Sequence, residues 1–154
     1  MKDYIRKTYA EINLSNIREN VSKVIKRFDN YDYYFGVVKA DSYGHGALKS
    51  VQSVIDGGCN YLAVATLEEA LSIREKFSDI PILCFGIVPY EYIDLCVKNN
   101  ITITVSSYDY ALELVNVFDE KLKVHIKVNT GMNRLGIADS IDFKKTINLL
   151  WENN

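Results

Sequence analysis

Hydrophobic positions along the chain follow two spacings, one typical of helices and one typical of strands. After an alternating stretch at residues 8–14, apolar residues between Ile17 and Phe28 recur on one helical face, behind an expected N-cap at Ser15. Residues 33–40 are aromatic and β-branched on both faces, which predicts a strand buried on each side. The chain is therefore expected to begin with a helix followed by a strand.

From that point a strand and a helix alternate. Further strands are predicted at residues 61–65, 82–85, 101–105 and 123–129. The helices between and after them are predicted before Gly57-Gly58, after a capping-box pattern at residues 66–69, after Pro89, at residues 108–118 and from about residue 142 to 151. Short connections between these elements imply parallel strands and the α/β class.

Two architectures fit this alternation, an open doubly wound sheet and a (β/α)8 TIM-type barrel, and the spacing alone does not choose between them. A closed barrel needs eight strands in typically ~250 residues, whereas about five units are visible here. A barrel would therefore be partial. No linker divides residues 1–154, which we expect to form one domain or one piece of a domain.

Composition narrows the range of partners. Eighteen Lys and Arg residues against 20 Asp and Glu give a formal charge of -2, which provides no basic surface for nucleic acid. No apolar run approaches the ~20 residues that span a bilayer, and the first residues lack a secretory pattern, so we expect no membrane association and a cytoplasmic location. Cys59, Cys84 and Cys96 lack zinc-type spacing and are expected to be buried free thiols, with no metal site.

Lys39 is the first candidate functional residue, because it ends an apolar strand and precedes a loop containing Gly44 and Gly46. A lysine largely desolvated at the carboxyl end of such a strand has a lowered pKa and a nucleophilic amine, as a Schiff-base lysine requires. The alternative is a structural lysine whose stem lies on apolar surface while its ammonium reaches water. The glycines suit an anion near a helix start only weakly.

The end of the last predicted strand carries the second group of candidates. His125, Lys127 and Asn129 share one face of the strand, and the opposite face is apolar. In a barrel the polar face would point into the lumen, where Lys127 would need a partner or a modification. An edge strand with its polar face in water is an equally good explanation. Arg134, in the following loop, could bind a carboxylate or phenolate, or form an ordinary surface salt bridge.

Residues 38–46, Val-Lys-Ala-Asp-Ser-Tyr-Gly-His-Gly, and residues 127–136, Lys-Val-Asn-Thr-Gly-Met-Asn-Arg-Leu-Gly, resemble the two signatures of the alanine racemases. These are pyridoxal 5'-phosphate enzymes with a (β/α) barrel followed by a β-rich carboxyl-terminal domain. Residues 8–14 also resemble the start of that family. The resemblance covers essentially the whole chain but only the first part of a member, so residues 1–154 would be the amino-terminal barrel segment, without the carboxyl-terminal domain.

The resemblance also implies roles for single residues. Lys39 would hold the cofactor as a Schiff base and act as acid or base on one face of the substrate's α-carbon, and Tyr43 would hydrogen-bond the cofactor phosphate. Arg134 would contact the cofactor's phenolic oxygen and the substrate carboxylate, and Lys127 matches a lysine that is often carbamylated and then braces that arginine. The family usually has Asp where this chain has Asn129.

For the complete protein, the resemblance implies a homodimeric racemase that interconverts L- and D-alanine and supplies D-alanine for peptidoglycan. The acid or base on the opposite face would come from a tyrosine of the later domain, so we expect the 154-residue chain alone to be inactive. We also expect it to self-associate through uncovered strand edges and helix faces. A racemase for serine or another small amino acid, a noncatalytic binding or assembly module, and an open-sheet binding protein are the alternatives.

Overall fold

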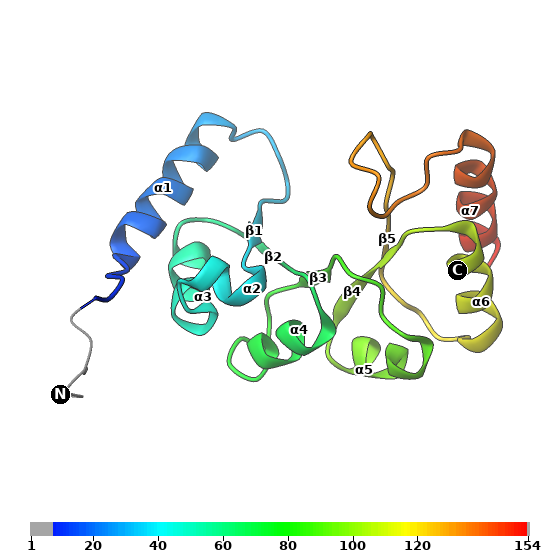
Figure 1. The fold of residues 1–154 in the computed structure, drawn as a ribbon, viewed down its shortest axis with the longest axis horizontal. Coiled ribbons are helices and arrows are strands. Elements are labelled where there is room, and N and C mark those ends of the chain that lie inside the picture. The colour runs from blue at the N-terminus through cyan, green and yellow to red at the C-terminus, as the bar shows by residue number, and fades with distance from the viewer. Residues whose placement is uncertain (1–7, 154) are drawn as a thin grey trace.

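Five parallel strands in one curved sheet organise the molecule in the computed structural model, which describes residues 8–153 (Figure 1). The strands are β1 (Phe35–Val37), β2 (Tyr61–Val64), β3 (Ile82–Cys84), β4 (Ile101–Val105) and β5 (Val124–Ile126). Each pairs with the next along the chain, in the order β1-β2-β3-β4-β5. The parallel pairing confirms the α/β prediction.

The strand order also separates the two architectures that the sequence left open. A doubly wound sheet reverses its strand order at a switch point and carries helices on both faces. Here the order is sequential without a reversal, and the helices that follow the strands lie along the outer side of the arc (Figure 1). The fold is therefore a partial TIM-type barrel of five strand–helix units.

Most helices begin and end close to the predicted positions, whereas the element at Lys39–Gly44 lies where the end of a strand and a loop were predicted. The helices are α1 (Leu14–Arg27), α2 (Lys39–Gly44), α3 (Ala47–Asp56), α4 (Leu67–Arg74), the 3-10 helix η1 (Tyr90–Tyr92), α5 (Ile93–Lys98), α6 (Tyr108–Val117) and α7 (Ser140–Glu152). The N-cap of α1 is Asn13 rather than Ser15, because the Asn13 side chain accepts a hydrogen bond from the amide of Asn16 at 3.1 Å. The capping box at Thr66 and Glu69 is confirmed.

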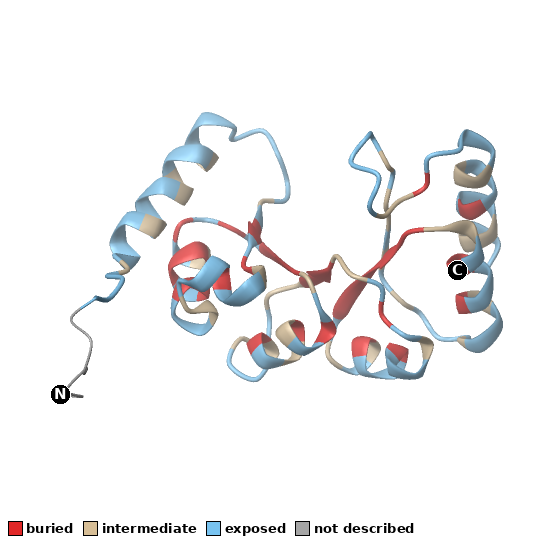
Figure 2. Ribbon diagram, in the orientation of Figure 1, coloured by how far each residue is buried: buried red, intermediate tan, exposed pale blue. Residues whose placement is uncertain are grey.

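The main core lies between the outer face of the sheet and the helices, where Figure 2 shows the buried residues on the strands and on the helix sides that face them. Leu62, Val64 and Ile103 are fully buried there, between the strands and helices such as α3 and α4. Alternate strand residues point the other way, and Tyr61 and Leu83 belong to a separate small cluster on the inner face. The strict alternation gives the sheet two different faces.

The inner face mixes apolar and hydroxyl side chains. Buried Tyr61 and Thr102 share a hydrogen bond of 2.5 Å between their hydroxyl oxygens, and the Thr104 hydroxyl donates to the carbonyl of Cys84 at 2.7 Å. These bonds satisfy polar groups that the neighbouring strands bury. Thr102 and Thr104 thus link β4 to β2 and β3 on the side where the lumen of a complete barrel would lie.

The prediction that the first strand is buried on both faces is wrong. Only Gly36 of β1 is buried, because its outer face packs so closely on α3 that an added Cβ would lie 2.2 Å from Val54 Cγ1. Phe35 and Val37 are exposed on the inner face. β1 pairs only with β2 within residues 8–153, so its second edge has no partner strand there.

The three cysteines are buried and free, as predicted. Burial raises the pKa of all three thiols, to about 12 for Cys96, so they remain protonated near neutral pH. Across residues 8–153, every helix is too short or too polar to cross a membrane.

Candidate active site

Lys39 lies where β1 ends, and the chain then turns in an unusual way. Ala40, Asp41, Ser42 and Tyr43 all have positive φ, between 50° and 56°, so residues 40–43 form a left-handed turn rather than an α-helix. The left-handed conformation costs roughly 1–2 kcal/mol for each residue with a side chain. Such strain is typical of functional sites and persists only where surrounding contacts hold it.

Hydrogen bonds from both ends hold the left-handed turn. The Ser42 amide donates to the carbonyl of Val38 at 3.0 Å, and the Gly46 amide donates to the carbonyl of Asp41 at 3.0 Å. The Asp41 carboxylate also accepts the amide of Ala47 at 2.6 Å, at the start of α3. Gly44 and Gly46 have φ of 83° and 86°, a conformation that glycine adopts most easily, and they carry the chain from the turn into α3.

The Lys39 side chain is half-buried, which corrects the expectation of a largely desolvated amine. Its Nζ lies 6.0 Å from the centre of the Tyr43 ring. The open inner face beside β1 explains the remaining exposure. Ser42 Oγ, in the same turn, is buried and has no hydrogen-bond partner among residues 8–153. The turn therefore presents an amine, an exposed phenol and an unpaired hydroxyl within five consecutive residues.

β5 presents its polar residues to the inner face. Val124 and Ile126 line a cavity beside α6 and α7, while the His125 ring lies 5.9 Å from Phe35 and 6.4 Å from Tyr61, centre to centre. Lys127 follows on the same side as His125. Lys127 is half-buried, and its Nζ lies 5.6 Å from the centre of the Phe85 ring, at cation–π distance.

Asn129 organises the loop that follows. Its Oδ1 accepts the amides of Gly131 and Asn133, each at 3.1 Å, and its Nδ2 donates to Asn133 Oδ1 at 2.9 Å. An aspartate carboxylate could accept hydrogen bonds from the same two backbone amides. Asn129, which stands where the family usually has Asp, therefore allows the same turn. The base of the loop is closed by the Ile137 amide, which donates to the carbonyl of Lys127 at 2.8 Å.

Arg134 lies on this loop and is exposed. The two ion pairs found within residues 8–153 join Glu19 to Lys23 and Asp142 to Lys145, and Arg134 takes part in neither. The alternative role predicted for Arg134, a surface salt bridge, is therefore not found within the described residues. The guanidinium remains available for a ligand.

The curved sheet brings the two predicted regions to one side of the molecule. Lys39 and Lys127 both follow the carboxyl ends of parallel strands, which lie at the same edge of a sheet. Phe35 of β1 reaches His125 of β5 across the inner face, although three strands separate them. Within residues 8–153, the Lys39 ammonium lies near the Tyr43 ring and the Lys127 ammonium near the Phe85 ring. Arg134 takes part in neither of these two contacts.

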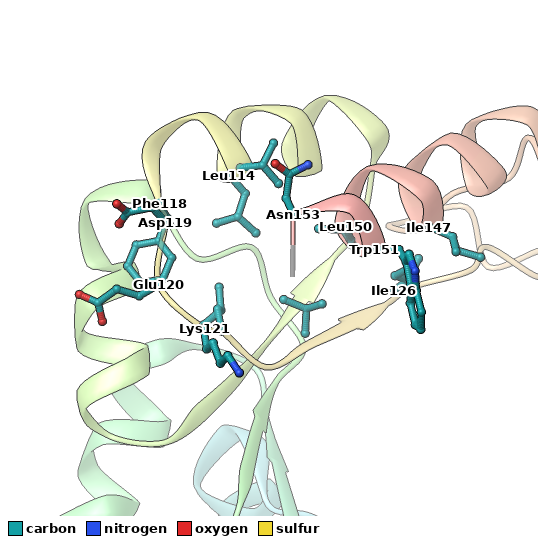
Figure 3. Close-up of a pocket in the computed structure, with 13 residues that line it drawn as sticks. Leu114, Phe118, Asp119, Glu120, Lys121, Ile126, Ile147, Leu150, Trp151 and Asn153 are labelled. Carbon is teal, nitrogen blue, oxygen red and sulfur yellow. The ribbon is translucent and has the colours of Figure 1, made fainter.

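A large cavity lies away from these residues. It measures about 440 Å³ and is lined by side chains of α6, α7 and β5, including Leu114, Ile147 and Trp151, and by residues of the loop between α6 and β5 such as Glu120 (Figure 3). None of the four predicted site residues lines it. Its walls are the outer side of β5 and two helices, so its position does not match the carboxyl-end site.

Sequence reasoning missed two residues at this edge. Phe85 follows β3 and contacts Lys127, and its position after an apolar strand was the available signal. Glu69 was recognised only as part of a capping box, yet its Oε1 also accepts the amide of Ala40 at 2.7 Å. That contact joins residues 29 positions apart, and no local sequence pattern predicts it.

A partial (β/α) barrel with a lysine in a strained turn after its first strand, and a second lysine after its fifth, has the architecture of barrel enzymes, which place their chemistry at the carboxyl ends of the strands. The sequence profile of the alanine racemase N-terminal domain matches residues 12–154. The chain belongs to this family.

Relatives with assigned names support the same family. The chain is 39% identical to alanine racemase 1 of Bacillus subtilis over 153 residues, which is 99% of this chain and 39% of that protein. It is 40% identical to the alanine racemase of Clostridium novyi over 156 residues, covering 97% of this chain and 40% of that protein. The chain thus spans about two fifths of the length of the curated relatives that it matches.

Solved structures agree with the fold. The alanine racemase of E. faecalis superposes with a TM-score of 0.87 at 32% identity, covering 92% of this chain and 39% of that one. The alanine racemase of Bacillus anthracis, solved with bound L-Ala-P, gives 0.86 at 30% identity, covering 96% and 39%. A histidine racemase from Leuconostoc mesenteroides gives 0.82 at 26% identity, covering 91% and 38%.

Proposed function

We propose that this chain is the amino-terminal barrel segment of a pyridoxal 5'-phosphate-dependent alanine racemase. The observation that carries the proposal is the strained turn after β1, which presents Lys39, Tyr43 and the unpaired Ser42 hydroxyl together. Both signatures lie at the carboxyl edge of the sheet, where barrel enzymes place their chemistry. In the complete protein, located in the cytoplasm, the reaction is the interconversion of L- and D-alanine, which supplies D-alanine for cell-wall peptidoglycan.

The residues present fit the cofactor. An aldehyde needs an amine, an anionic phosphate needs hydrogen-bond donors, and a phenolic oxygen is matched by a guanidinium. Lys39 supplies the amine, Tyr43 an exposed hydroxyl for the phosphate, and Arg134 a guanidinium outside any ion pair of the described residues. When bound, pyridoxal phosphate supplies an electron sink that acidifies the substrate's α-proton.

The residues of this chain would do the following work. Lys39 Nζ binds the cofactor and then takes or returns the α-proton on one face of the substrate. Arg134 orients the substrate carboxylate by paired N–H donors. Lys127 supports the Arg134 loop, because its carbonyl accepts the Ile137 amide that closes the loop. A proton donor for the opposite face would come from a later domain of a partner subunit, so this chain alone is inactive.

A second candidate function is racemisation of another amino acid. The histidine racemase superposes almost as well as the alanine racemases, so this part of the barrel is compatible with more than one substrate side chain. The residues named here recognise the cofactor and the carboxylate, which all amino acids share. Substrate profiling of a complete enzyme that contains this segment distinguishes alanine from serine or histidine.

Covalent attachment at Lys39 tests the cofactor assignment. We expect the 154-residue chain, incubated with pyridoxal phosphate, reduced with borohydride and digested, to carry the pyridoxyl group mainly at Lys39. The Lys39→Ala variant should lose this labelled peptide, and turnover of L-alanine should be absent in both proteins. The matched control is Lys49→Ala, which removes an exposed lysine of α3 and should leave labelling at Lys39 unchanged.

The proposal fails if the label is spread over exposed lysines without preference for Lys39. Measurable racemisation of L-alanine by the isolated chain would instead overturn its inactivity while leaving the cofactor site intact. A noncatalytic module predicts a third pattern, in which the folded chain carries no label at Lys39.

Exposed apolar surface supports self-association of the chain. Trp151 and Ile141 on α7 are exposed by 78% and 62%. Phe35 and Val37 are exposed on β1, whose second edge has no partner strand within residues 8–153. Burial of such surface is favourable at ~25 cal/mol per Å² of apolar area. Light scattering should therefore show the apparent mass rising with concentration. A constant monomeric mass would contradict this expectation.

A further inference from the structure

Glu69 connects two loops at the carboxyl edge of the sheet. Its Oε2 accepts the amide of Ala65 at 2.8 Å and, more weakly, that of Thr66 at 3.4 Å, at the start of α4. Its Oε1 accepts the amide of Ala40 at 2.7 Å, in the loop after β1. One carboxylate therefore bonds the backbone after β2 and the backbone immediately after Lys39.

The Ala40 amide is the nitrogen of the peptide bond that follows Lys39, so Glu69 fixes the plane of that bond. On the other side of Lys39, the Val38 amide donates to the carbonyl of Ala63 on β2 at 2.9 Å. Lys39 is thus held on both sides by the neighbouring strand–helix unit. These two bonds set the direction in which its side chain leaves the backbone.

The conformation that Glu69 holds is one that the chain would not adopt by itself. Four consecutive residues of the left-handed turn carry side chains at positive φ, a backbone conformation that is unfavourable for L-amino acids. A hydrogen bond to a charged acceptor is stronger than one to a neutral acceptor and can offset such strain. Glu69 bonds Ala40 at the start of the turn, and the Asp41 carboxylate bonds Ala47 at the start of α3. Glu69 is the one of the two that lies outside the loop.

We propose that Glu69 is a positioning residue for Lys39: by bonding Ala40 it stabilises the left-handed turn and aims the lysine amine at the cofactor. The proposal rests on the proposed function of Lys39. Glu69 does not touch the reacting atoms in this role. Its capping of α4 is a separate contribution that the same side chain makes through Ala65 and Thr66.

Glu69→Gln is the informative variant, because the amide keeps the length of the side chain but replaces one of its two acceptor oxygens. Glu69→Asp keeps the charge but shortens the reach between the two loops. In both we expect hydrogen exchange of the Ala40 amide to accelerate roughly tenfold, the factor that corresponds to losing a charge-assisted bond. This measurement needs no cofactor.

Two amine reactions then test whether Lys39 itself is affected. Reductive methylation with formaldehyde reports general accessibility, and we expect its rate at Lys39, relative to Lys49 in the same molecule, to rise severalfold as the turn loosens. Pyridoxyl labelling at Lys39 should fall severalfold in the same variants. Opposite changes in the two reactions identify lost positioning in a variant whose circular dichroism and melting temperature show that it remains folded, because unfolding would also expose Lys39 and lower its specific labelling.

The controls separate positioning from capping and charge. Glu68→Gln makes the same charge change in the same turn of α4, on an exposed side chain. Thr66→Ala removes the N-cap hydroxyl, which accepts the Glu69 amide at 3.3 Å, without touching Ala40. Both should leave Ala40 exchange and the Lys39 reactions unchanged, even where Thr66→Ala lowers the melting temperature.

Each outcome decides between the two proposals. If Glu69→Gln and Glu69→Asp leave Ala40 exchange and the relative methylation of Lys39 unchanged, or if Thr66→Ala reproduces their effects, the positioning role is wrong. If Ala40 and Lys39 respond as expected but the unsubstituted chain takes no pyridoxyl label at Lys39, Glu69 positions Lys39 and the cofactor assignment fails instead.

Discussion

Replacing Leu62 with alanine is expected to lower the free energy of unfolding by about 2–5 kcal/mol. Leu62 is fully buried at the centre of β2, where it pairs with Gly36 of β1 and Ile82 of β3. Removing its side chain loses transfer free energy and leaves a cavity. The three backbones that meet there are held in register by the sheet, so collapse into the cavity is limited.

Denaturant unfolding measures this loss as a shift of the midpoint at constant slope. Leu112→Ala is the matched control, because the same side chain is removed from α6 at a position 39% exposed. It should cost about 1 kcal/mol or less. Equal losses at the two positions would show that the sheet does not form the core described here.

Gly86→Ala is the second substitution with a large expected effect. A Cβ at Gly86 would lie 2.4 Å from the carbonyl oxygen of Ala65, to which the Gly86 amide also donates at 3.1 Å. The obstacle is backbone, so no side chain can rotate away, and overpacking of this kind costs about 1–3 kcal/mol. Because Glu69 bonds the Ala65 amide, we also expect Ala65 and Ala40 to shift together in the amide NMR spectrum.

A different steric conflict at Gly36 provides the control. There an added Cβ would meet Val54 Cγ1, a side-chain atom, at 2.2 Å. Truncating Val54 to alanine should therefore recover part of the Gly36→Ala loss, and the double variant should lose less than the sum of the two singles. For Gly86→Ala no side-chain truncation should help. Recovery by Val54→Ala at Gly86 would argue against a local backbone clash.

Much of the fold follows from local sequence patterns. Apolar periodicity predicted the five strands and the helices between them, because each element must bury one face against the next. The capping box at Thr66 was readable for the same reason, since its partners lie three residues apart. The burial of β1 was predicted wrongly, because exposure of Phe35 and Val37 depends on which strands flank β1, and periodicity does not report that.

The candidate site was also predictable only in part from the sequence. Its signature residues, Lys39 and Lys127, could be found in the sequence because both follow apolar strands and carry motifs that resemble a known family. Their surroundings could not. The contact between Glu69 and Ala40 and the approach of Phe85 to Lys127 join residues 29 and 42 positions apart, and only packing of separate strand–helix units creates them.

By itself, the sequence determined the α/β class, the order of the elements and the residues that carry the family signatures, because helix and strand periods, caps and motifs are local properties of the chain. The tertiary structure decided that the strands run in sequential order around an arc, that residues 40–43 turn left-handed, and that Glu69 bonds the amide of Ala40. These features depend on hydrogen bonds and contacts between distant segments, whose energies exist only once the sheet has assembled.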